Sequence, residues 1–158
     1  MIKEIIQYPN EILRCQAETV DMAALKAGRY DQLAQDLIDS MEKHGGLGIA
    51  APQIGVSLRV VVIDTRQGPL GLFNPQISVF SWRKKTDEEG CLSLPGIYGM
   101  VKRSVKITVN AFNRAGEKIN FKAEGLFARV IQHEADHLAG VLFIDHAKKI
   151  HSREKHAK

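Results

Sequence analysis

The residues of this chain best suited to chemistry lie near its C-terminal end, where two histidines are four positions apart. At this spacing on a helix, His133 and His137 project from the same face, so both imidazoles can bind one metal ion. Glu134 lies between them but to one side, where it can reach a metal-bound water more easily than the ion itself. Such a site suits Zn²⁺ or Fe²⁺. The alternative is a polar helix face that simply meets solvent.

A metal site of this kind needs a third ligand, and Cys91 is the strongest candidate. It follows Gly90, where the backbone can approach an ion closely, and Pro95 and Gly96 stiffen the segment beyond it. A thiolate with two imidazoles makes a tetrahedral site whose fourth position is left for water. The alternative is a buried structural thiol. Cys15 is the other cysteine, and in a reducing compartment such residues are more often free or metal-bound than paired.

The elements that must position these residues can be predicted from periodicity. Apolar residues at helical spacing predict helices over residues 28–44, ended by Gly45 and Gly46, and over residues 126–138. A glycine-rich loop follows the first helix over residues 45–55. Alternation of apolar and polar residues predicts strands, with a hairpin turn at residues 113–116. The predicted strands cover residues 58–64, 72–73, 76–82, 105–111 and 119–123.

The order of these elements indicates the fold class. Strands cluster between the two helices instead of alternating with them, which favours an α+β fold. We expect antiparallel sheets packed around a central metal-bearing helix. The 158 residues contain no repeat or Pro/Ser-rich linker, so we expect a single domain.

Charge is distributed unevenly along the chain. Residues 146–158 hold five basic side chains and one acid, which accounts for the whole net charge of +4. A basic tail of this kind can touch RNA, although more often it is a solvated, frayed end. No apolar run reaches membrane-spanning length, and no signal or transit peptide is evident at the N-terminus. We therefore expect a cytoplasmic protein without a membrane or DNA partner, and a monomer.

Three segments of the chain combine these candidate residues with their neighbours, namely Gly-Leu-Gly-Ile-Ala-Ala-Pro-Gln at residues 46–53, Glu-Gly-Cys-Leu-Ser-Leu at 89–94 and Gln-His-Glu-Ala-Asp-His-Leu at 132–138. Through these segments the chain resembles the peptide deformylases, which remove the N-formyl group from nascent polypeptides. The segments match the signature motifs of that family in order, and their spacing extends the resemblance over nearly the whole chain. The resemblance implies a deformylase-like catalytic domain over residues 1–145, followed by the short basic tail at 146–158.

The resemblance also implies roles for individual residues. Cys91, His133 and His137 would hold one divalent metal ion, typically Fe²⁺ in the cell, which Zn²⁺, Ni²⁺ or Co²⁺ can replace. Glu134 would take a proton from the metal-bound water and later deliver it to the leaving amine. Gln53 and the backbone N–H of Leu92 would stabilise the oxyanion on the formyl carbon, and such paired donors form a common oxyanion hole.

Substrate contacts follow from the same resemblance. In the family the formylmethionyl peptide lies extended beside the first motif and pairs with its backbone like an added strand. Glycines there let two backbones meet closely, and the alternative is that they serve only to form turns. The methionine side chain would need an apolar pocket near the metal, and Leu47, Leu126, Val130, His133 and Tyr98 could line it. The residues assigned to substrate binding are Gly46, Leu47, Gly48, Gly90, Leu126 and Val130.

Charged residues around this site raise two further hypotheses. Arg129 stands where the family often has an apolar residue, and it could point to solvent, narrow the pocket, or pair with Asp136 or a substrate carboxylate. We assign it a role at the pocket rim. Glu89, Arg103 and Asp136 are expected to form an ion-paired frame behind the metal loop, unless they are ordinary surface charges.

Two other functions are compatible with part of the pattern. The two-histidine helix alone could belong to a zinc endopeptidase, but the cysteine segment and Gln53 fit deformylation better. A metal-binding homologue without catalysis is the second alternative, although every residue needed for turnover is present. The short C-terminal segment argues against strong ribosome docking through a long terminal helix, and leaves a weak electrostatic contact with ribosomal RNA open.

Overall fold

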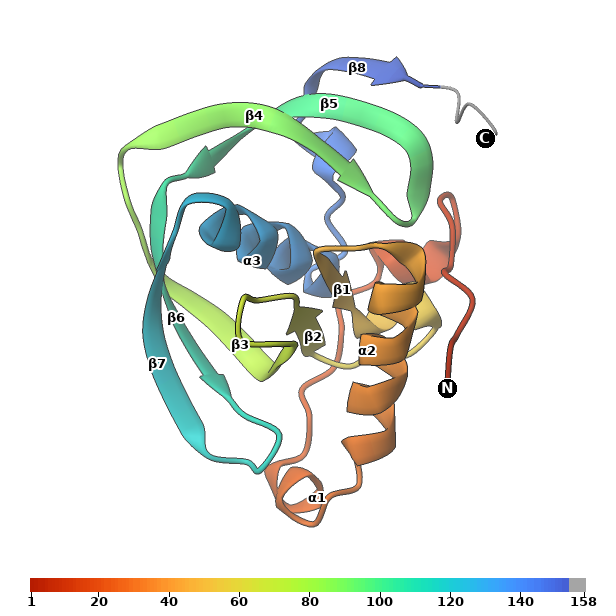
Figure 1. The fold of residues 1–158 in the computed structure, drawn as a ribbon, viewed down its shortest axis with the longest axis vertical. Helices are drawn as coiled ribbons and strands as arrows, with labels where there is room; N and C mark the ends of the chain where they lie inside the picture. The colour runs from red at the N-terminus through yellow and green to blue at the C-terminus, as the bar shows by residue number, and fades with distance from the viewer. Residues whose placement is uncertain (154–158) are drawn as a thin grey trace.

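The computed structural model describes residues 1–153. More residues lie in strands than in helices, and the two long helices come before and after most of the strands in the sequence (Figure 1). In chain order the elements are η1 (Glu11–Arg14), α1 (Met22–Lys26), α2 (Asp31–His44), β1 (Gly48–Ala50), η2 (Ala51–Ile54), β2 (Val60–Ile63), β3 (Leu70–Phe80), β4 (Lys84–Cys91), β5 (Leu94–Ser104), β6 (Lys106–Phe112), β7 (Lys118–Glu124), α3 (Gly125–Leu138), η3 (Phe143–Asp145) and β8 (Lys148–Ser152).

The strands form two antiparallel sheets. One has five strands in the order β1-β2-β3-β6-β7, and the other has three in the order β4-β5-β8. Helix α3 lies between them, with the five-stranded sheet curving around one side and the three-stranded sheet on the other (Figure 1). The predicted α+β class, with antiparallel sheets around the helix that carries His133 and His137, is confirmed.

Strand β2 explains how two helices share one sheet. Its four residues are all buried, because alternate side chains enter different cores. Val61 and Ile63 pack in the cluster that contains Ile131 and Leu138 of α3, whereas Val60 and Val62 pack in the cluster of α2. This two-sided burial accounts for the unbroken apolar run in the sequence.

Several predicted boundaries change in the structure. The first helix begins at Asp31 instead of residue 28, because residues 27–30 form a turn in which Gly28 has a φ of 76°. The strands predicted at residues 72–73 and 76–82 are one strand, β3, interrupted by two register shifts opposite β6. The predicted hairpin between β6 and β7 is present. Strands β4 and β5 had no prediction, since the segment Lys84–Cys91 is mostly charged and shows no apolar alternation.

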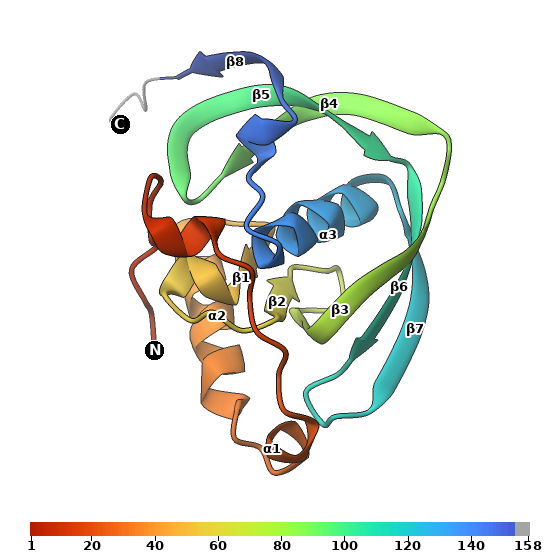
Figure 2. The same ribbon diagram turned by 180° about the vertical axis from the view of Figure 1, so that it is seen from behind.

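The C-terminal segment also differs from expectation. The expected exposure of Lys148–Ser152 to solvent is confirmed, but a frayed end is wrong, because these residues form β8 and pair with β5 from Ile97 to Met100. The part of the basic tail at residues 154–158 lies outside the described residues. On the back of the molecule, the N-terminal segment runs beside the chain that leaves α3, where Ala17 N donates to Leu138 O at 2.8 Å (Figure 2).

Candidate active site

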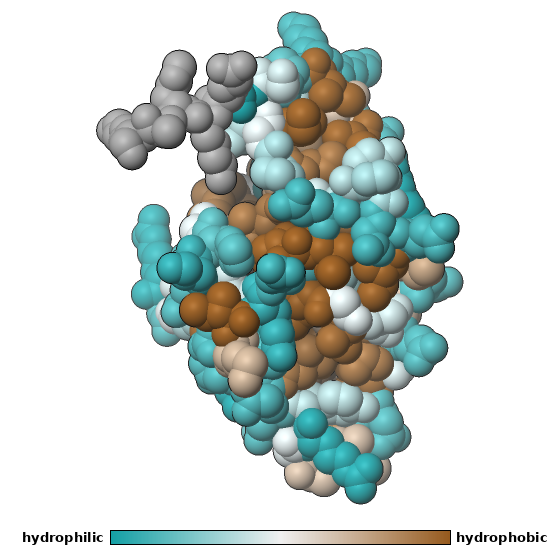
Figure 3. Space-filling model, turned by 90° about the vertical axis from the view of Figure 1, so that its right-hand side faces the viewer, coloured by the Kyte–Doolittle hydropathy of each residue, from teal (hydrophilic) through white to brown (hydrophobic). Residues whose placement is uncertain are grey.

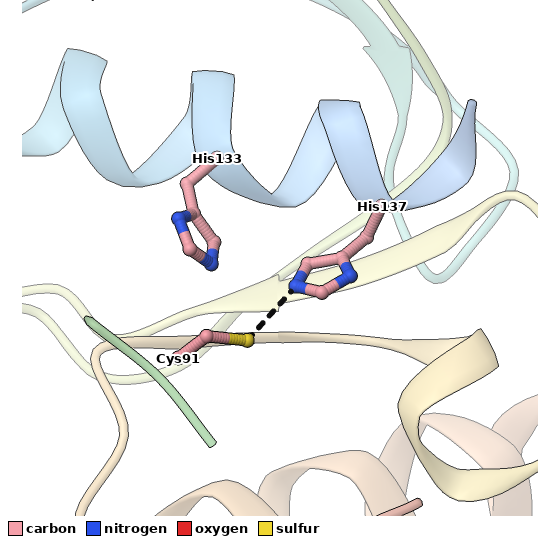
Figure 4. A group of neighbouring side chains, drawn as sticks. All are labelled: Cys91, His133 and His137. Atoms are coloured by element: carbon pink, nitrogen blue, oxygen red, sulfur yellow. Dashed lines mark hydrogen bonds between the residues drawn. The ribbon is translucent and has the colours of Figure 1, made fainter. Parts of the chain in front are cut away.

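The predicted metal ligands come from two elements that meet at the centre of the molecule. Helix α3 carries His133 and His137, and Cys91 is the last residue of β4. Both imidazole rings point from the helix toward the sulfur atom (Figure 4). The Cys91 Sγ and His137 Nε2 atoms are 3.3 Å apart, and one ligand atom from each of the three residues lies within 4.8 Å of the others. The structure therefore brings the predicted cluster together.

The donor atoms of this cluster fit a tetrahedral metal ion. Metal–sulfur and metal–nitrogen bonds of the usual length put sulfur and nitrogen about 3.5 Å apart, close to the separation observed. His133 uses its Nδ1 in a 2.9 Å hydrogen bond with Glu89 Oε1, which leaves Nε2 for the cluster. Burial holds the pKa of His137 well below its usual value, so its imidazole stays neutral. A neutral imidazole is the form that binds metal ions.

Glu134 is buried beside the ligands. Its Oε2 atom has no hydrogen-bond partner among residues 1–153, so it can accept a hydrogen bond from water or from a substrate N–H. Burial raises the pKa of Glu134 to about 7. A carboxyl with a pKa near neutrality can both accept and return a proton. Gly48 makes room for it, because a Cβ at position 48 would lie 2.9 Å from Glu134 Oε1.

Gln53 reaches the cluster from a third element, separate from α3 and β4. It lies in η2, the turn that follows β1, and its Oε1 accepts a hydrogen bond from Ala50 N at 2.9 Å. This contact fixes the orientation of the amide, so that Nε2 donates to Ser93 Oγ at 3.2 Å and to Cys91 Sγ at 3.6 Å. Leu92 follows Cys91 directly in the turn between β4 and β5 and lines the same cavity. Both residues are thus next to the metal ligands, and their oxyanion role stays a prediction.

A buried carboxylate organises the ion pairs behind the metal ligands. Glu89 receives hydrogen bonds from His133, from Arg103 Nε at 2.9 Å and Nη2 at 3.0 Å, and from Arg129 Nη1 at 2.7 Å. Burial alone would raise the pKa of Glu89, but the hydrogen bonds from His133 and Arg103 lower it well below its usual value. Arg103 also donates to Asp136 at 2.5 Å. The predicted frame of Glu89, Arg103 and Asp136 is therefore present.

Arg129 belongs to this frame, so the rim role predicted for it is wrong. Its side chain is buried, with 8% of the residue exposed. It contributes only part of one wall of the cavity that opens in front of the cluster. Besides Glu89 it donates to Val101 O at 2.9 Å and Lys85 O at 2.7 Å, and Asp136 pairs with Arg103 instead. The sequence carried a signal for this arrangement, because positions 129 and 133 share one helix face and can reach the same carboxylate.

A cavity of about 880 Å³ opens in front of the cluster. Leu47 and Leu126 line it while 52% and 63% exposed, as apolar residues at a binding site often are. Apolar surface gathers across the middle of the face that contains α2 and the β4–β5 turn (Figure 3). All the residues predicted to bind substrate line this cavity, namely Gly46, Leu47, Gly48, Gly90, Leu126 and Val130. The lining residues that the prediction missed include Glu4, Gln7 and His44.

Side chains of the site fill the space beside two loop glycines. A Cβ at Gly46 would lie 2.9 Å from Leu92 Cδ1, and one at Gly48 would lie 2.8 Å from Val130 Cγ1. Neighbouring side chains of the site thus fill the space that a side chain at either position would need. Pairing of a peptide with this segment stays a prediction.

Comparison with known proteins decides the family. A family model described as polypeptide deformylase matches residues 2–153. The chain belongs to this family. Peptide deformylases are hydrolases that act on N-formylmethionyl peptides. No helix within residues 1–153 has the length and apolar character needed to cross a membrane.

Individual relatives match over nearly their whole length. The peptide deformylase of Desulforudis audaxviator is 44% identical over 153 residues, which cover 96% of this chain and 97% of that protein. The crystal structure of the Thermotoga maritima peptide deformylase has a TM-score of 0.89 and 36% identity, covering 94% of this chain and 99% of that chain. A Met-Ala-Ser-bound class I type b peptide deformylase from Acinetobacter baumannii has a TM-score of 0.87 and 33% identity. The match covers 92% of this chain and 99% of that chain.

Proposed function

We propose that this protein removes the formyl group from the N-terminal formyl-methionine of newly made polypeptides and releases formate. The observation that carries the proposal is the buried carboxylate of Glu134 beside a Cys-His-His cluster. Gln53 completes the arrangement, with an amide that donates toward Cys91. Proton transfer, metal binding and oxyanion stabilisation are the three tasks that amide hydrolysis requires.

Cys91, His133 and His137 would hold one divalent ion. We propose Fe²⁺ as the ion in the cell, with Zn²⁺, Ni²⁺ or Co²⁺ able to replace it, because thiolate and imidazole donors suit these metals. When bound, the ion makes a water molecule more acidic and polarises the formyl oxygen. Glu89 keeps the His133 ring oriented through the Nδ1 hydrogen bond, which is the usual support for a metal-binding histidine.

The residues of the chain then carry the proton transfers. Glu134 accepts a proton from the attacking water as the water oxygen adds to the formyl carbon. Gln53 Nε2 and the Leu92 backbone N–H donate to the negatively charged oxygen, and each such donor contributes roughly 3–4 kcal/mol. The carbon–nitrogen bond then breaks as Glu134 gives its proton to the departing amine nitrogen. The formic acid so formed gives its remaining proton to the amine, and formate leaves.

The cavity would bind the formylmethionyl peptide. Leu47, Leu126 and Val130 offer an apolar wall next to the ligands, as a methionine side chain requires. Gly46, Gly48 and Gly90 are the proposed backbone neighbours of the peptide. The binding of Met-Ala-Ser by the relative from Acinetobacter baumannii supports this class of substrate.

Formate release from formyl-Met-Ala-Ser tests the proposal. The wild-type protein, loaded anaerobically with Fe²⁺, should release formate without cleaving an internal bond. The Glu134→Ala variant should keep its metal and lose roughly 10²- to 10⁴-fold in rate, the contribution expected of a general acid–base. Internal cleavage would favour a zinc endopeptidase, and metal binding without formate release would favour a non-catalytic homologue.

Location, assembly and domain limits are part of the proposal. Because its substrates arise at the ribosome, we place the protein in the cytoplasm, and we propose a monomer with its catalytic domain in residues 1–145. The basic tail would make at most a weak, salt-sensitive contact with ribosomal RNA. Co-sedimentation with ribosomes that is lost on removing residues 151–158 would support that contact.

A further inference from the structure

The strand β8 lies beside the part of β5 that lines the cavity. Ile97 pairs with Ser152 and Tyr98 with His151 in the antiparallel ladder. Beyond the strand, Arg153 N donates to Gly96 O at 2.7 Å. Gly96, Ile97 and Tyr98 all line the cavity in front of the metal ligands. The C-terminal strand thus forms the support directly behind one wall of this cavity.

Two side chains from this segment contact Tyr98. The Arg153 guanidinium carbon lies 4.8 Å from the centre of the Tyr98 ring, which is a cation–π distance. The His151 ring stacks on the same tyrosine, with ring centres 6.1 Å apart and an interplanar angle of 29°. Tyr98 is therefore held by two residues that are far from it in sequence.

The same two side chains also share one carboxylate. Arg153 Nη2 donates to Glu88 Oε2 at 2.8 Å, and His151 Nε2 lies 3.4 Å from this oxygen. Glu88 precedes Glu89 on β4 and itself lines the cavity. This carboxylate ties Arg153 and His151 to β4, so their contacts with Tyr98 are fixed from a second side.

Tyr98 packs closely on the backbone next to a metal ligand. A Cβ at Gly90 would lie 2.8 Å from Tyr98 Cε1, so the ring occupies the space that a side chain at position 90 would fill. Gly90 immediately precedes Cys91. The aromatic ring therefore lies between the β8 segment and the backbone of the active site.

We propose that β8 is a substrate-positioning element, in which Arg153 and His151 hold Tyr98 as the wall that receives the peptide from its third residue onward. The proposal rests on the deformylase function proposed above. With the formyl carbon at the metal ligands and methionine against Leu126 and Val130, the rest of the peptide must use the remaining cavity. Tyr98 and Glu88 form part of that remainder. Arg153 and His151 are positioning residues, since they act through Tyr98.

A purely structural role for β8 is the competing explanation, because an added strand also covers the edge of β5. Loss of that role would lower the melting temperature and impair every substrate alike. Loss of substrate positioning would instead raise KM only for peptides long enough to reach Tyr98. Peptide length therefore separates the two explanations.

The experiment compares formyl-Met-Ala with formyl-Met-Ala-Ser-Ala on Arg153→Ala, His151→Ala and the double variant. Each single change should raise KM for the longer peptide about 2- to 5-fold, the range of an exposed cation–π contact, with kcat unchanged. KM for the dipeptide should not change. Tyr98→Ala should have the larger effect, and Tyr98→Phe should restore wild-type behaviour because the ring is retained. Lys148→Ala on the same strand is the matched control, since its side chain has no ion pair within the described residues.

Binding of unformylated Met-Ala-Ser, measured by calorimetry, gives a second readout that does not depend on turnover. Its affinity should fall by the same factor in Arg153→Ala and should not change in Lys148→Ala. An unchanged KM for the longer peptide in the double variant, or an equal rise for both lengths, would overturn the proposal. Failure of the proposed function would look different, because the wild-type protein would then release no formate from either peptide.

Discussion

The Glu134 carboxylate depends on a residue that carries no functional group. Gly48 faces Glu134 and Val130, and the space left by its missing side chain is filled by both of them. The pattern of residue types revealed which carboxylate could move protons. Its burial and its room to function come from packing against β1.

We expect Gly48→Ala to impair catalysis without removing the metal site. The added Cβ would lie 2.9 Å from Glu134 Oε1, so the carboxylate must shift and the rate should fall at least tenfold. Overpacking of this kind costs about 1–3 kcal/mol of stability. Formate release, metal content and urea unfolding would be measured together. Gly71→Ala is the control, since its Cβ would meet only Phe73 Cε2 at 3.6 Å, and a normal rate in Gly48→Ala would contradict the prediction.

Gln53 should contribute to the rate through its amide. Gln53→Ala removes the donor that faces Cys91, and we expect kcat/KM to fall by roughly 10²- to 10³-fold, as for other oxyanion donors. Steady-state kinetics with formyl-Met-Ala-Ser would measure this loss. Ser93→Ala removes only the hydroxyl that accepts from Gln53, so it should cost much less. Similar losses in the two variants would mean that Gln53 acts by orienting its neighbours.

At the scale of elements, Arg129 joins helix α3 to the three-stranded sheet. Its guanidinium donates to a carboxylate on β4 and to backbone oxygens of both β4 and β5. The sequence predicted α3 well, because its apolar residues recur at helical spacing. It did not predict β4, because the residues of that strand are held by ion pairs and by pairing with β5, neither of which leaves a periodic apolar pattern.

We expect Arg129→Lys to weaken metal binding although it keeps the charge. A lysine cannot reproduce the planar set of donors, so Glu89 and the two carbonyl groups lose fixed partners. Loss of such a supporting contact typically reduces metal affinity 10- to 100-fold. Competition with a fluorescent zinc chelator would measure it. The exposed Arg114, which pairs with Asp31 far from the site, provides the control variant Arg114→Lys, and equal affinities in both variants would refute the role of Arg129.

At the scale of the whole molecule, a bound metal ion would connect the two sheets through α3. Its ligands come from β4 and from the helix that packs on the five-stranded sheet. Chelation should therefore lower the melting temperature by about 5–10 °C, as expected for loss of a ligand present at 100 times its Kd from a domain of this size. Differential scanning calorimetry with and without chelator would show the shift. Cys91→Ala should be insensitive to the chelator, and an insensitive wild-type protein would argue against a resident ion.

An ion pair links the N-terminal segment to the chain after α3, and it should make stability depend on pH. Arg14 donates two hydrogen bonds to Asp145, which lower the pKa of that carboxyl. A lowered pKa in the folded state adds stability that is present above the unfolded value of about 3.9 and is lost as pH falls through the folded value. Both side chains are more than a third exposed, so solvent screening keeps the contribution below about 1 kcal/mol.

Urea unfolding of Asp145→Asn at pH 6 and pH 3 tests this linkage. The variant should be less stable than the wild-type protein at pH 6, and the difference should shrink at pH 3, which lies below the unfolded pKa, because the carboxyl of the unfolded wild-type chain then gains a proton. Asp64→Asn, at a residue without an ion pair in the described part of the chain, should show no such change. A difference independent of pH would mean that Asp145 acts through its hydrogen bond to Leu142 N alone.

The sequence by itself pointed to the Cys91, His133 and His137 cluster, the neighbouring carboxylate of Glu134, the helix that bears three of these residues and the α+β class. These features rest on local spacing, since a helix repeats every 3.6 residues and a strand every two. Only the tertiary structure decided that Arg129 supports Glu89, that Gly48 makes room for Glu134, and that Lys148–Ser152 form a strand beside the cavity. Each of these depends on contacts between residues far apart in the chain, whose distances and orientations no local pattern records.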